Sequence, residues 1–429
     1  MDVVYVNKGN TTRIKESLMD VVYATETPPA SFTSSIFLAG PSPRDPTHPN
    51  WRPAAISHLE ALGYNGVVFI PLPRDGQWLH SYDDQVGWET TYLNMADLVL
   101  FWVPRNMKTL PALTTNMEFG LWVKTGKAVL GFPGGAPKMR YLDWHADKES
   151  VPVFHDLKEM LKHAVNTLKG ADVREGGERD VPYFIWKLPH FQDWYRLQQD
   201  AGNRLDGAEL LWNFRVGPNK GFTFAYVMHV DVHITSEGRN KVNEFIFGRP
   251  DIATIVGYQG NPWFSIGRKT DDSGHLTFMS HLLNTKIAII REFRSPARTA
   301  DGFIRELPGG SSWKPGEDPF TTMTHELEEE TGLGEDAGFG IEPQRLYKVG
   351  MRQLCGTLSV HMAHVFACEL TKDEMAFLEK QQADNTVHGV AEDTERTYVE
   401  VHRLGELMSG SDLDWSMMGM ILTALMQEE

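Results

Sequence analysis

The sequence predicts an α/β protein with two domains. Between residues 34 and 168, short apolar runs alternate with amphipathic stretches, which is typical of a doubly wound parallel sheet. After residue 220, runs of alternating polar and apolar residues predict antiparallel strands, and these lead into a glycine-rich loop and an acidic helix. With 429 residues and 41% hydrophobic content, the chain can bury more than one core.

Charge and cysteine content exclude several classes of protein. A surface that coats nucleic acid is basic, whereas the formal net charge here is −16, so we expect no stable nucleic-acid partner. An anionic small substrate remains compatible, because a bound metal ion reverses the local field. Cys355 and Cys368 are the only cysteines, which excludes a disulfide framework and indicates a reducing, cytoplasmic setting. No signal-peptide pattern and no membrane-spanning run is evident, so we expect no membrane partner.

The predicted elements of the first domain follow one another as strand, helix, strand. Each strand is a short buried run, and each helix shows the spacing of an amphipathic helix. We expect strands at residues 34–40, 65–73, 97–104 and 127–133, and helices at residues 48–63, 88–96, 114–126 and 155–168. A parallel sheet covered on both faces binds its ligand at the carboxyl ends of the strands.

Polar side chains follow these strands at the expected ligand-binding edge. Pro41 and Ser42 follow the first strand, and Arg140, a residue type that binds phosphate, follows the fourth. Glu118 lies in the first turn of the helix after the third strand, where the helix dipole favours an ionised carboxylate, as a nucleophile requires. The spacing of Thr115 and Glu118 also matches a capping box, in which Glu118 would only satisfy a backbone N–H. The residue pattern leaves both interpretations open.

Residues 35–142 resemble the nucleoside 2-deoxyribosyltransferase superfamily. The matching pieces are IFLAGP at residues 36–41, ADLVLFWVP at 96–104 and NMEFGLWVKTGKAVLGFP at 116–133. The resemblance implies a flavodoxin-like fold and an enzyme that cleaves or exchanges the N-glycosidic bond of nucleosides or their 5′-monophosphates. It implies that Glu118 is the catalytic nucleophile and that Asp97 is a second catalytic acid near the sugar or base. Substrate contacts are expected at Gly40, Pro41, Ser42, Asn116 and Arg140.

One residue of the transferase pattern is missing. These enzymes carry a further aspartate shortly before the nucleophile, whereas residues 112–116 read ALTTN. The group that exchanges a proton with the leaving base therefore stays open, and so does the choice between base transfer and hydrolysis.

The domain boundary is expected in a charged, glycine-bearing stretch. We expect the first domain at residues 1–168, a linker at 169–181 and the second domain at 182–429, with its core at about 248–425. The aromatic stretch at 183–199 would expose a large apolar patch unless it packs on a neighbour. Antiparallel strands are expected at residues 222–234, 241–249 and 251–258, followed by a strand within 281–294.

The most specific pattern in the chain is a glycine-rich loop followed by an acidic helix at residues 306–333. Asp318 and Pro319 are expected as N-cap and first helical residue, and Gly332 as the residue just past the end. Three glutamates of this helix are spaced at i, i+3 and i+4 and therefore share one helix face: Glu326, Glu329 and Glu330. Their carboxylates predict a binding site for Mg²⁺ or Mn²⁺. A solvated acidic face is the alternative interpretation.

This stretch and the strand before it resemble the Nudix hydrolase superfamily, in particular its ADP-ribose pyrophosphatase-like branch. Gly310, Glu317 and the run HELEEETGL at residues 325–333 fill the Nudix signature. There are two departures: six residues rather than five separate Gly310 from Glu317, and His325 replaces an arginine. The resemblance implies an α/β/α fold with an added antiparallel sheet on its N-terminal side, and a magnesium-dependent pyrophosphohydrolase.

The Nudix resemblance also implies residue roles. Glu326, Glu329 and Glu330 are expected to bind metal, the last two also to take part in catalysis, and Arg291 and Arg294 to contact phosphate. Glu392 or Glu395 is expected to replace a glutamate that many of these enzymes carry in a later loop. By contrast, His361 and His364 do not predict zinc, because residues three apart in a strand point to opposite faces.

Together these patterns predict a bifunctional, nucleotide-processing enzyme. One domain would hydrolyse a nucleoside diphosphate derivative, and the other would cleave or exchange a nucleotide N-glycosidic bond. The alternative is that one domain only senses a nucleotide and regulates its catalytic neighbour. Both resemblances imply a homodimer.

Overall fold

The computed structural model describes residues 19–43, 49–76, 81–260, 274–312, 314, 316–334, 338–389 and 395–427. The chain divides into two compact units, Met1–Gly248 and Arg249–Glu429. Each unit is built around its own sheet and its own buried clusters of apolar side chains. Among the described helices, none is long and apolar enough to cross a membrane.

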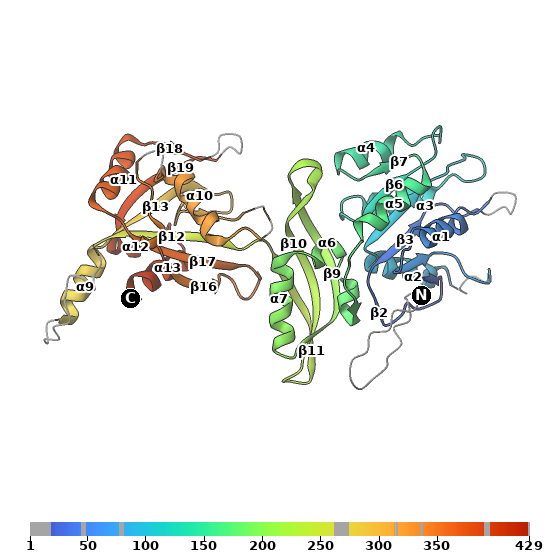
Figure 1. Ribbon diagram of the computed structural model, residues 1–429, viewed down its shortest axis with the longest axis horizontal. Helices are drawn as coiled ribbons and strands as arrows, with labels where there is room; N and C mark the ends of the chain where they lie inside the picture. Colours follow the sequence, from blue (N-terminus) through green and yellow to red (C-terminus); the bar gives the residue numbers. More distant parts are fainter. Residues whose placement is uncertain are drawn as a thin grey trace. The chain divides into compact units, whose positions relative to one another are not determined.

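A parallel sheet forms the centre of the first unit (Figure 1). Its strands are β1 (Asp20–Tyr23), β3 (Ser35–Ala39), β4 (Val67–Ile70), β5 (Leu98–Trp102), β6 (Ala128–Gly131) and β7 (Val153–Phe154). They lie in the order β1-β4-β3-β5-β6-β7, and every neighbouring pair is parallel. Apart from β1 at the edge, this is the 2-1-3-4-5 order of flavodoxin-like folds. The predicted doubly wound sheet is therefore confirmed.

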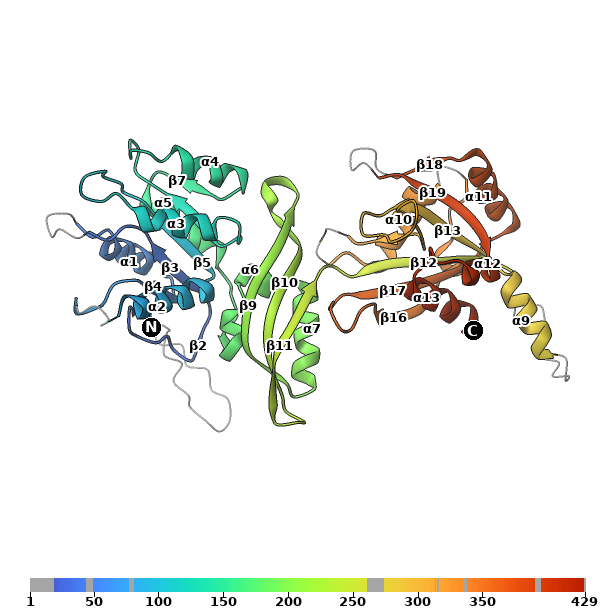
Figure 2. The ribbon, with the colours of Figure 1, turned by 180° about the vertical axis from the view of Figure 1, so that it is seen from behind.

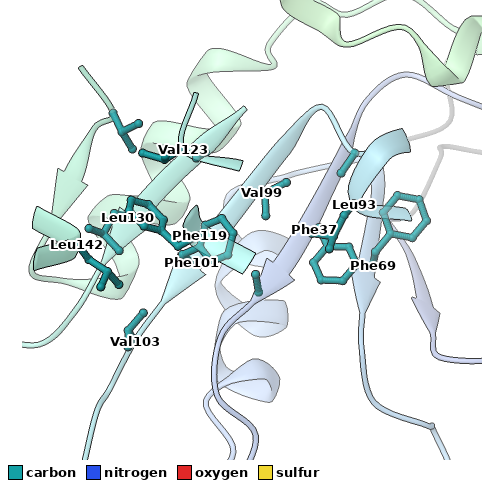
Figure 3. Packing of buried hydrophobic residues seen from close by; sticks show 14 of the residues in the cluster. Phe37, Phe69, Leu93, Val99, Phe101, Val103, Phe119, Val123, Leu130 and Leu142 are labelled. Carbon is teal, nitrogen blue, oxygen red and sulfur yellow. The ribbon is translucent and has the colours of Figure 1, made fainter. Parts of the chain in front are cut away.

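Helices cover both faces of this sheet because successive strand residues point to opposite sides. Ile36 and Leu38 pack with α1 (Arg52–Ala61) and α5 (Leu157–Thr167). Phe37 packs in the opposite cluster, shown in Figure 3, which includes Phe119 and Leu142. That cluster brings together α2 (Tyr82–Met95), α3 (Leu113–Trp122) and α4 (Arg140–Lys148). The sequence interpretation had no counterpart for α4.

The stretch expected to be a linker is folded onto the first unit. It contains β8 (Arg174–Glu175), which pairs with β2 (Ser31–Phe32), and a 3-10 helix, η1 (Gly176–Asp180). Arg174 is completely buried, and its guanidinium forms an ion pair with Asp97. A buried ion pair ties a segment to its neighbour, because breaking it would leave a charge without compensation. The compact units accordingly divide after Gly248 and not at 169–181.

The aromatic stretch packs within the first unit, on an antiparallel sheet of its own. This sheet has the order β11-β10-β9 and consists of β9 (Arg204–Val216), β10 (Phe222–Ile234) and β11 (Arg239–Gly248), with η2 (Pro218–Lys220) between the first two. After α6 (Tyr183–Trp186), helix α7 (Pro189–Asp200) places Phe191 and His190 against the buried ring of Tyr226 on β10. The sheet expected at the start of the second domain therefore clusters with the first unit.

A mixed sheet forms the second unit (Figure 2). Its main path is β16-β17-β12-β13-β19-β18, while β14 pairs with β13 and β15 with β12. The strands are β12 (Ile252–Gln259), β13 (Lys286–Phe293), β14 (Phe303–Glu306), β15 (Gly309–Gly310), β16 (Tyr347–Gln353), β17 (Met362–Glu369), β18 (Val387–His388) and β19 (Thr397–Arg403). Thus β12 belongs to this sheet, not to the antiparallel sheet in which the sequence pattern had placed it.

Helices lie on both faces of the mixed sheet as well. Met323 of α10 (Pro319–Thr331) and Met375 of α11 (Lys372–Asp384) share one buried cluster. Leu407 of α12 (Leu404–Ser409) and Ile421 of α13 (Trp415–Met426) share the other. The unit also contains α9 (Gly274–Asn284) and η4 (Pro343–Arg345). Two helical layers therefore enclose a single sheet.

Candidate active sites

A cleft of about 900 Å³ opens in the first unit at the carboxyl ends of its parallel strands. Gly40 to Pro43 line it after β3, Pro71 after β4, and residues 108–115 after β5. Strands β4 and β5 lie on opposite sides of β3, so the cleft is at the point where the strand order reverses. Open α/β sheets bind ligands at this position.

Two carboxylates from different helices line this cleft. Glu118 comes from α3 and Glu89 from α2. The pKa of Glu118 is raised to about 7, mainly by burial and also by the nearby Glu89 carboxylate, while Arg52 opposes the shift. Burial also raises the pKa of Glu89, against a hydrogen bond from Gln85 Nε2 to Glu89 Oε1 of 2.8 Å. The cleft therefore holds two carboxyl groups with raised pKa values, of which Glu118 can exchange a proton near neutral pH.

The capping-box interpretation of Glu118 is wrong. Helix α3 begins at Leu113, so Thr115 lies inside it, and its N-cap is Ala112, without a side-chain cap hydrogen bond. Ala112 has a left-handed backbone with φ of 59°, a conformation that costs a non-glycine residue about 1–3 kcal/mol. This turn lies in the wall of the cleft, directly before the helix that carries Glu118.

Gly40, Pro41 and Ser42, all predicted to contact substrate, line the cleft. Gly40 has φ of +142°, and a Cβ there would lie 2.2 Å from the carbonyl oxygen of Trp102. Only glycine therefore lets the chain leave β3 so close to β5. Beneath this turn, the buried side chain of Arg52 donates hydrogen bonds to it.

Three of the other predicted residues lie away from the cleft lining. Asp97 precedes β5 at the opposite end of the sheet, where it is 2% exposed and accepts hydrogen bonds from the Ser35 and Tyr183 backbone N–H groups. Its ion-pair partner is Arg174, and it is not part of the lining that contains Glu118. Asn116 accepts a hydrogen bond from Arg105, and Arg140 lines a separate hollow with Trp144. The expected contacts of these residues with sugar, base or phosphate gain no support from this placement.

The glycine-rich loop of the second unit packs against the acidic helix α10. The helix has Asp318 as its N-cap residue, Pro319 first and Gly332, with φ of 69°, as its C-cap, as predicted. Glu330 is 3% exposed, and its Oε2 accepts a hydrogen bond of 2.8 Å from the Gly309 backbone N–H. A Cβ on Gly310 would lie 2.3 Å from Glu326 Oε1, so the glycine makes room for that carboxylate.

Three carboxylates converge beside the glycine-rich loop: Glu292 of β13, Glu330 of α10 and Glu395, which lies two residues before β19. Each offers an oxygen, and these oxygens lie within 4.8 Å of one another. Burial raises the pKa of Glu292 to about 7 and that of Glu330 well above its usual value, and neighbouring carboxylates add to both shifts. Clustered oxygens that repel one another in this way suit a hard divalent cation.

The predicted metal ligands are only partly brought together. Glu330 belongs to the cluster, whereas Glu329 is exposed on the same helix. The pKa of Glu326 is raised to about 7, mainly by burial and also by the negative charges of Glu329 and Glu395. Its carboxylate therefore interacts electrostatically with the cluster. The sequence did not predict Glu292. Of the two loop candidates, Glu395 joins the cluster and Glu392 lies outside the described residues.

The two predicted phosphate contacts separate onto different faces. Arg294 forms ion pairs with Glu292 at 2.9 Å and Glu306 at 2.7 Å, so it borders the carboxylate cluster. Arg291 is adjacent to Glu292 in the strand and points the other way, onto the ring of Phe303 at 4.2 Å and to Asp301. His325, in place of the signature arginine, is exposed on α10.

His361 and His364, for which the sequence predicts no zinc site, contact different partners. His361 is hydrogen-bonded to Ser359, and His364 Nε2 lies 3.2 Å from Asp251 Oδ2. Within the described part of the chain, the carboxylate cluster is the one group of three or more residues with metal-ligand spacing.

Residues 33–136 match the family model described as "Nucleoside 2-deoxyribosyltransferase like". The match covers β3 to β6 and includes Glu89 and Glu118. The first unit thus contains a nucleoside 2-deoxyribosyltransferase-like domain, which indicates an enzyme of nucleoside glycosyl transfer. No curated protein matches the chain.

Proposed function

We propose that the first unit cleaves or exchanges the N-glycosidic bond of a nucleoside or its 5′-monophosphate. The observation that carries this proposal is the pair Glu118 and Glu89, which reach one cleft from two helices at the switch point of the sheet. A retaining glycosyl mechanism needs a nucleophilic carboxylate and a second group that exchanges a proton with the leaving base. Glu89 fills the second role, which the sequence analysis left open and for which Asp97 lies at the wrong end of the sheet.

In the first step, the ionised Glu118 carboxylate attacks the anomeric carbon and forms a glycosyl ester. The bond to the base breaks at the same carbon, and a protonated Glu89 donates its proton to the leaving nitrogen. In the second step, Glu89 accepts a proton from water or from a second base, which attacks the anomeric carbon and releases Glu118.

For the second unit we propose a Nudix-type pyrophosphohydrolase that acts on a nucleoside diphosphate derivative. The supporting observation is the cluster of Glu292 and Glu330, both buried, with the half-buried Glu395, beside helix α10. These residues, with Glu326 and Glu329, would hold Mg²⁺ or Mn²⁺, which when bound polarises a diphosphate and activates water. Arg294, at the rim of the cluster, would contact a phosphate.

The two proposed activities share one class of substrate. Hydrolysis of a dinucleotide, sugar nucleotide or nucleoside triphosphate can yield a nucleoside monophosphate, and a glycosidic enzyme of the proposed kind accepts such a product. The combination supports the bifunctional interpretation. The second candidate, a nucleotide-sensing second unit, is favoured by the exposed His325 in place of the signature arginine.

A panel of nucleotides, incubated with Mg²⁺ and the full chain, tests both proposals. We expect Glu118→Ala to stop release of free base and Glu329→Gln to stop diphosphate cleavage, each without affecting the other reaction. Glu60→Gln and Glu342→Gln, at exposed positions of the same units, are the matched controls and should retain both reactions. Diphosphate cleavage at the wild-type rate in Glu329→Gln contradicts the hydrolase proposal. Nucleotide binding without cleavage in the wild type supports the sensor instead.

A further inference from the structure

Arg52 is a completely buried arginine that lies behind the cleft of the first unit. It is 1% exposed, and its guanidinium carbon lies 4.8 Å from the centre of the Trp51 ring. Burying a guanidinium is costly unless its donors are satisfied and its charge is compensated. A residue that served only to fill this space would therefore be expected to be apolar.

The donors of Arg52 are directed at the turn that forms the cleft wall. Nε donates to the Leu38 carbonyl oxygen at 3.0 Å, Nη2 to the Gly40 carbonyl oxygen at 2.7 Å and Nη1 to Ser42 Oγ at 3.2 Å. The planar fork thus bridges the end of β3 and two residues of the cleft lining.

The charge of Arg52 is compensated from the cleft. Glu118 of α3 and Glu89 of α2 are the carboxylates whose fields act on it, and both line the cleft with Gly40 and Ser42. The other titratable side chains of the lining are Lys108, in the loop after β5, and Tyr82 of α2. Arg52 in turn lowers the pKa of both glutamates, against the effect of burial.

We propose that Arg52 is a positioning residue for glycosidic cleavage: its fork holds the turn at Gly40 and Ser42, and its charge keeps the Glu118 carboxylate ionised next to Glu89. This proposal rests on the proposed function of the first unit. In this role the positive charge of Arg52 is needed, whereas a residue that only packed in the core or only hydrogen-bonded the turn would not need a charge. The two parts of the role, the fork and the charge, are separable by substitution.

Two variants separate them in the full chain. Arg52→Lys keeps the charge but loses the fork, and Arg52→Gln keeps polar donors but loses the charge. The measurement is the pH profile of kcat/KM for base release, which reports the ionisation of the free enzyme. Arg196→Gln, at an exposed arginine of α7, is the matched control and should leave the profile unchanged. Circular dichroism and thermal unfolding show whether each variant is folded.

For Arg52→Gln we expect the acid limb of the profile to move up by about one pH unit, because removing a nearby opposite charge raises a carboxyl pKa by at least about that much. For Arg52→Lys we expect the acid limb to stay in place, while kcat/KM falls by a similar factor at every pH. An unchanged acid limb in Arg52→Gln overturns the charge role. If that variant does not fold, Arg52→Lys decides alone: an unchanged kcat/KM, or an acid limb moved up by a full unit, overturns the proposal.

Failure of the proposed function gives a different result. A wild-type chain that releases no base, or a Glu118→Ala variant that releases it at the wild-type rate, contradicts the glycosidic assignment itself. An active wild type that requires Glu118, with a profile that does not depend on residue 52, contradicts only the inference about Arg52.

Discussion

Replacing Glu118 with glutamine should abolish base release and yet stabilise the first unit at alkaline pH. The pKa of Glu118 rises from its usual value of 4.5 to about 7, mainly through burial. The unfolded chain therefore loses this proton at a lower pH than the folded chain. Between these two values the folded state binds more protons, so its stability falls as the pH rises and stays reduced above pH 7. Glutamine carries no such charge and avoids the loss.

The size of the effect follows from the shift. A shift of one pKa unit corresponds to 1.36 kcal/mol, so the full penalty above pH 7 is about 3 kcal/mol. At pH 5.5 only about 1 kcal/mol of it has developed. The stability advantage of Glu118→Gln over the wild type should therefore grow by about 2 kcal/mol between pH 5.5 and pH 8.

Native-state hydrogen exchange of peptides from β3 and β5 is the appropriate assay. It reports the opening free energy of the first unit without requiring the two units to unfold together. The control is Glu60→Gln, an exposed position on α1, for which we expect no pH-dependent difference from the wild type. If Glu118→Gln has the same or lower stability than the wild type at pH 8, the carboxylate is not held against a burial penalty and our reasoning is wrong.

Three further predictions concern the glycines and the metal site. Gly40→Ala should destabilise the first unit by about 2 kcal/mol more than Gly63→Ala. Both glycines have positive φ, but only a Cβ at Gly40 would meet the Trp102 carbonyl oxygen. Hydrogen exchange of β5 measures the difference, and equal losses of stability would contradict the steric argument. Gly310→Ala should reduce the rate of diphosphate cleavage at least about tenfold, while hydrogen exchange of the β12 backbone changes little. The added Cβ displaces only the flexible end of the Glu326 side chain. Full activity in a correctly folded variant would refute this prediction. Mn²⁺ binding should tighten as the pH rises from 6 to 8, by up to about tenfold per pH unit for each proton released. The reason is that Glu292 and Glu326 have pKa values of about 7 without metal and must lose their protons to bind it. If titration calorimetry shows an affinity that does not depend on pH, the carboxylate cluster is not the metal site.

Local patterns in the sequence predicted most of the elements that carry the two sites. The parallel strands and helix α10, with its Asp318, Pro319 and Gly332 boundaries, follow from apolar periodicity and capping rules, which depend on neighbouring residues. The cleft position also follows, because a parallel sheet places the carboxyl ends of β3 and β5 on one edge. Glu118 was found from the family resemblance and from a helix expected to start close before it, although α3 starts at Leu113 and places Glu118 in its second turn.

The positions of the residues that were missed or assigned the wrong role depend on long-range packing. Asp97 adjoins the same strand as the cleft but at its amino end, where its partner Arg174 comes from a segment that resembles a linker. Glu89 faces the cleft because of the way α2 packs. The helix was expected only from residue 88, whereas α2 begins at Tyr82, so Gln85, four residues before Glu89 on the same face, was assigned to a loop. Glu292 was not predicted because only the arginines of the same segment, Arg291 and Arg294, were considered as ligand contacts. Strand alternation alone places Glu292 on the other face of the sheet from Arg291.

The central claim, that Glu118 is the nucleophile of a glycosidic reaction, is tested most directly by trapping the glycosyl ester. A 2′-fluorinated nucleoside or nucleotide slows the breakdown of such an ester, and mass spectrometry of peptides locates the attached sugar. We predict one labelled peptide, containing Glu118, with release of one equivalent of free base and no label in Glu118→Ala. Base release with the label on another residue, or the same labelling in Glu118→Ala, would contradict the claim.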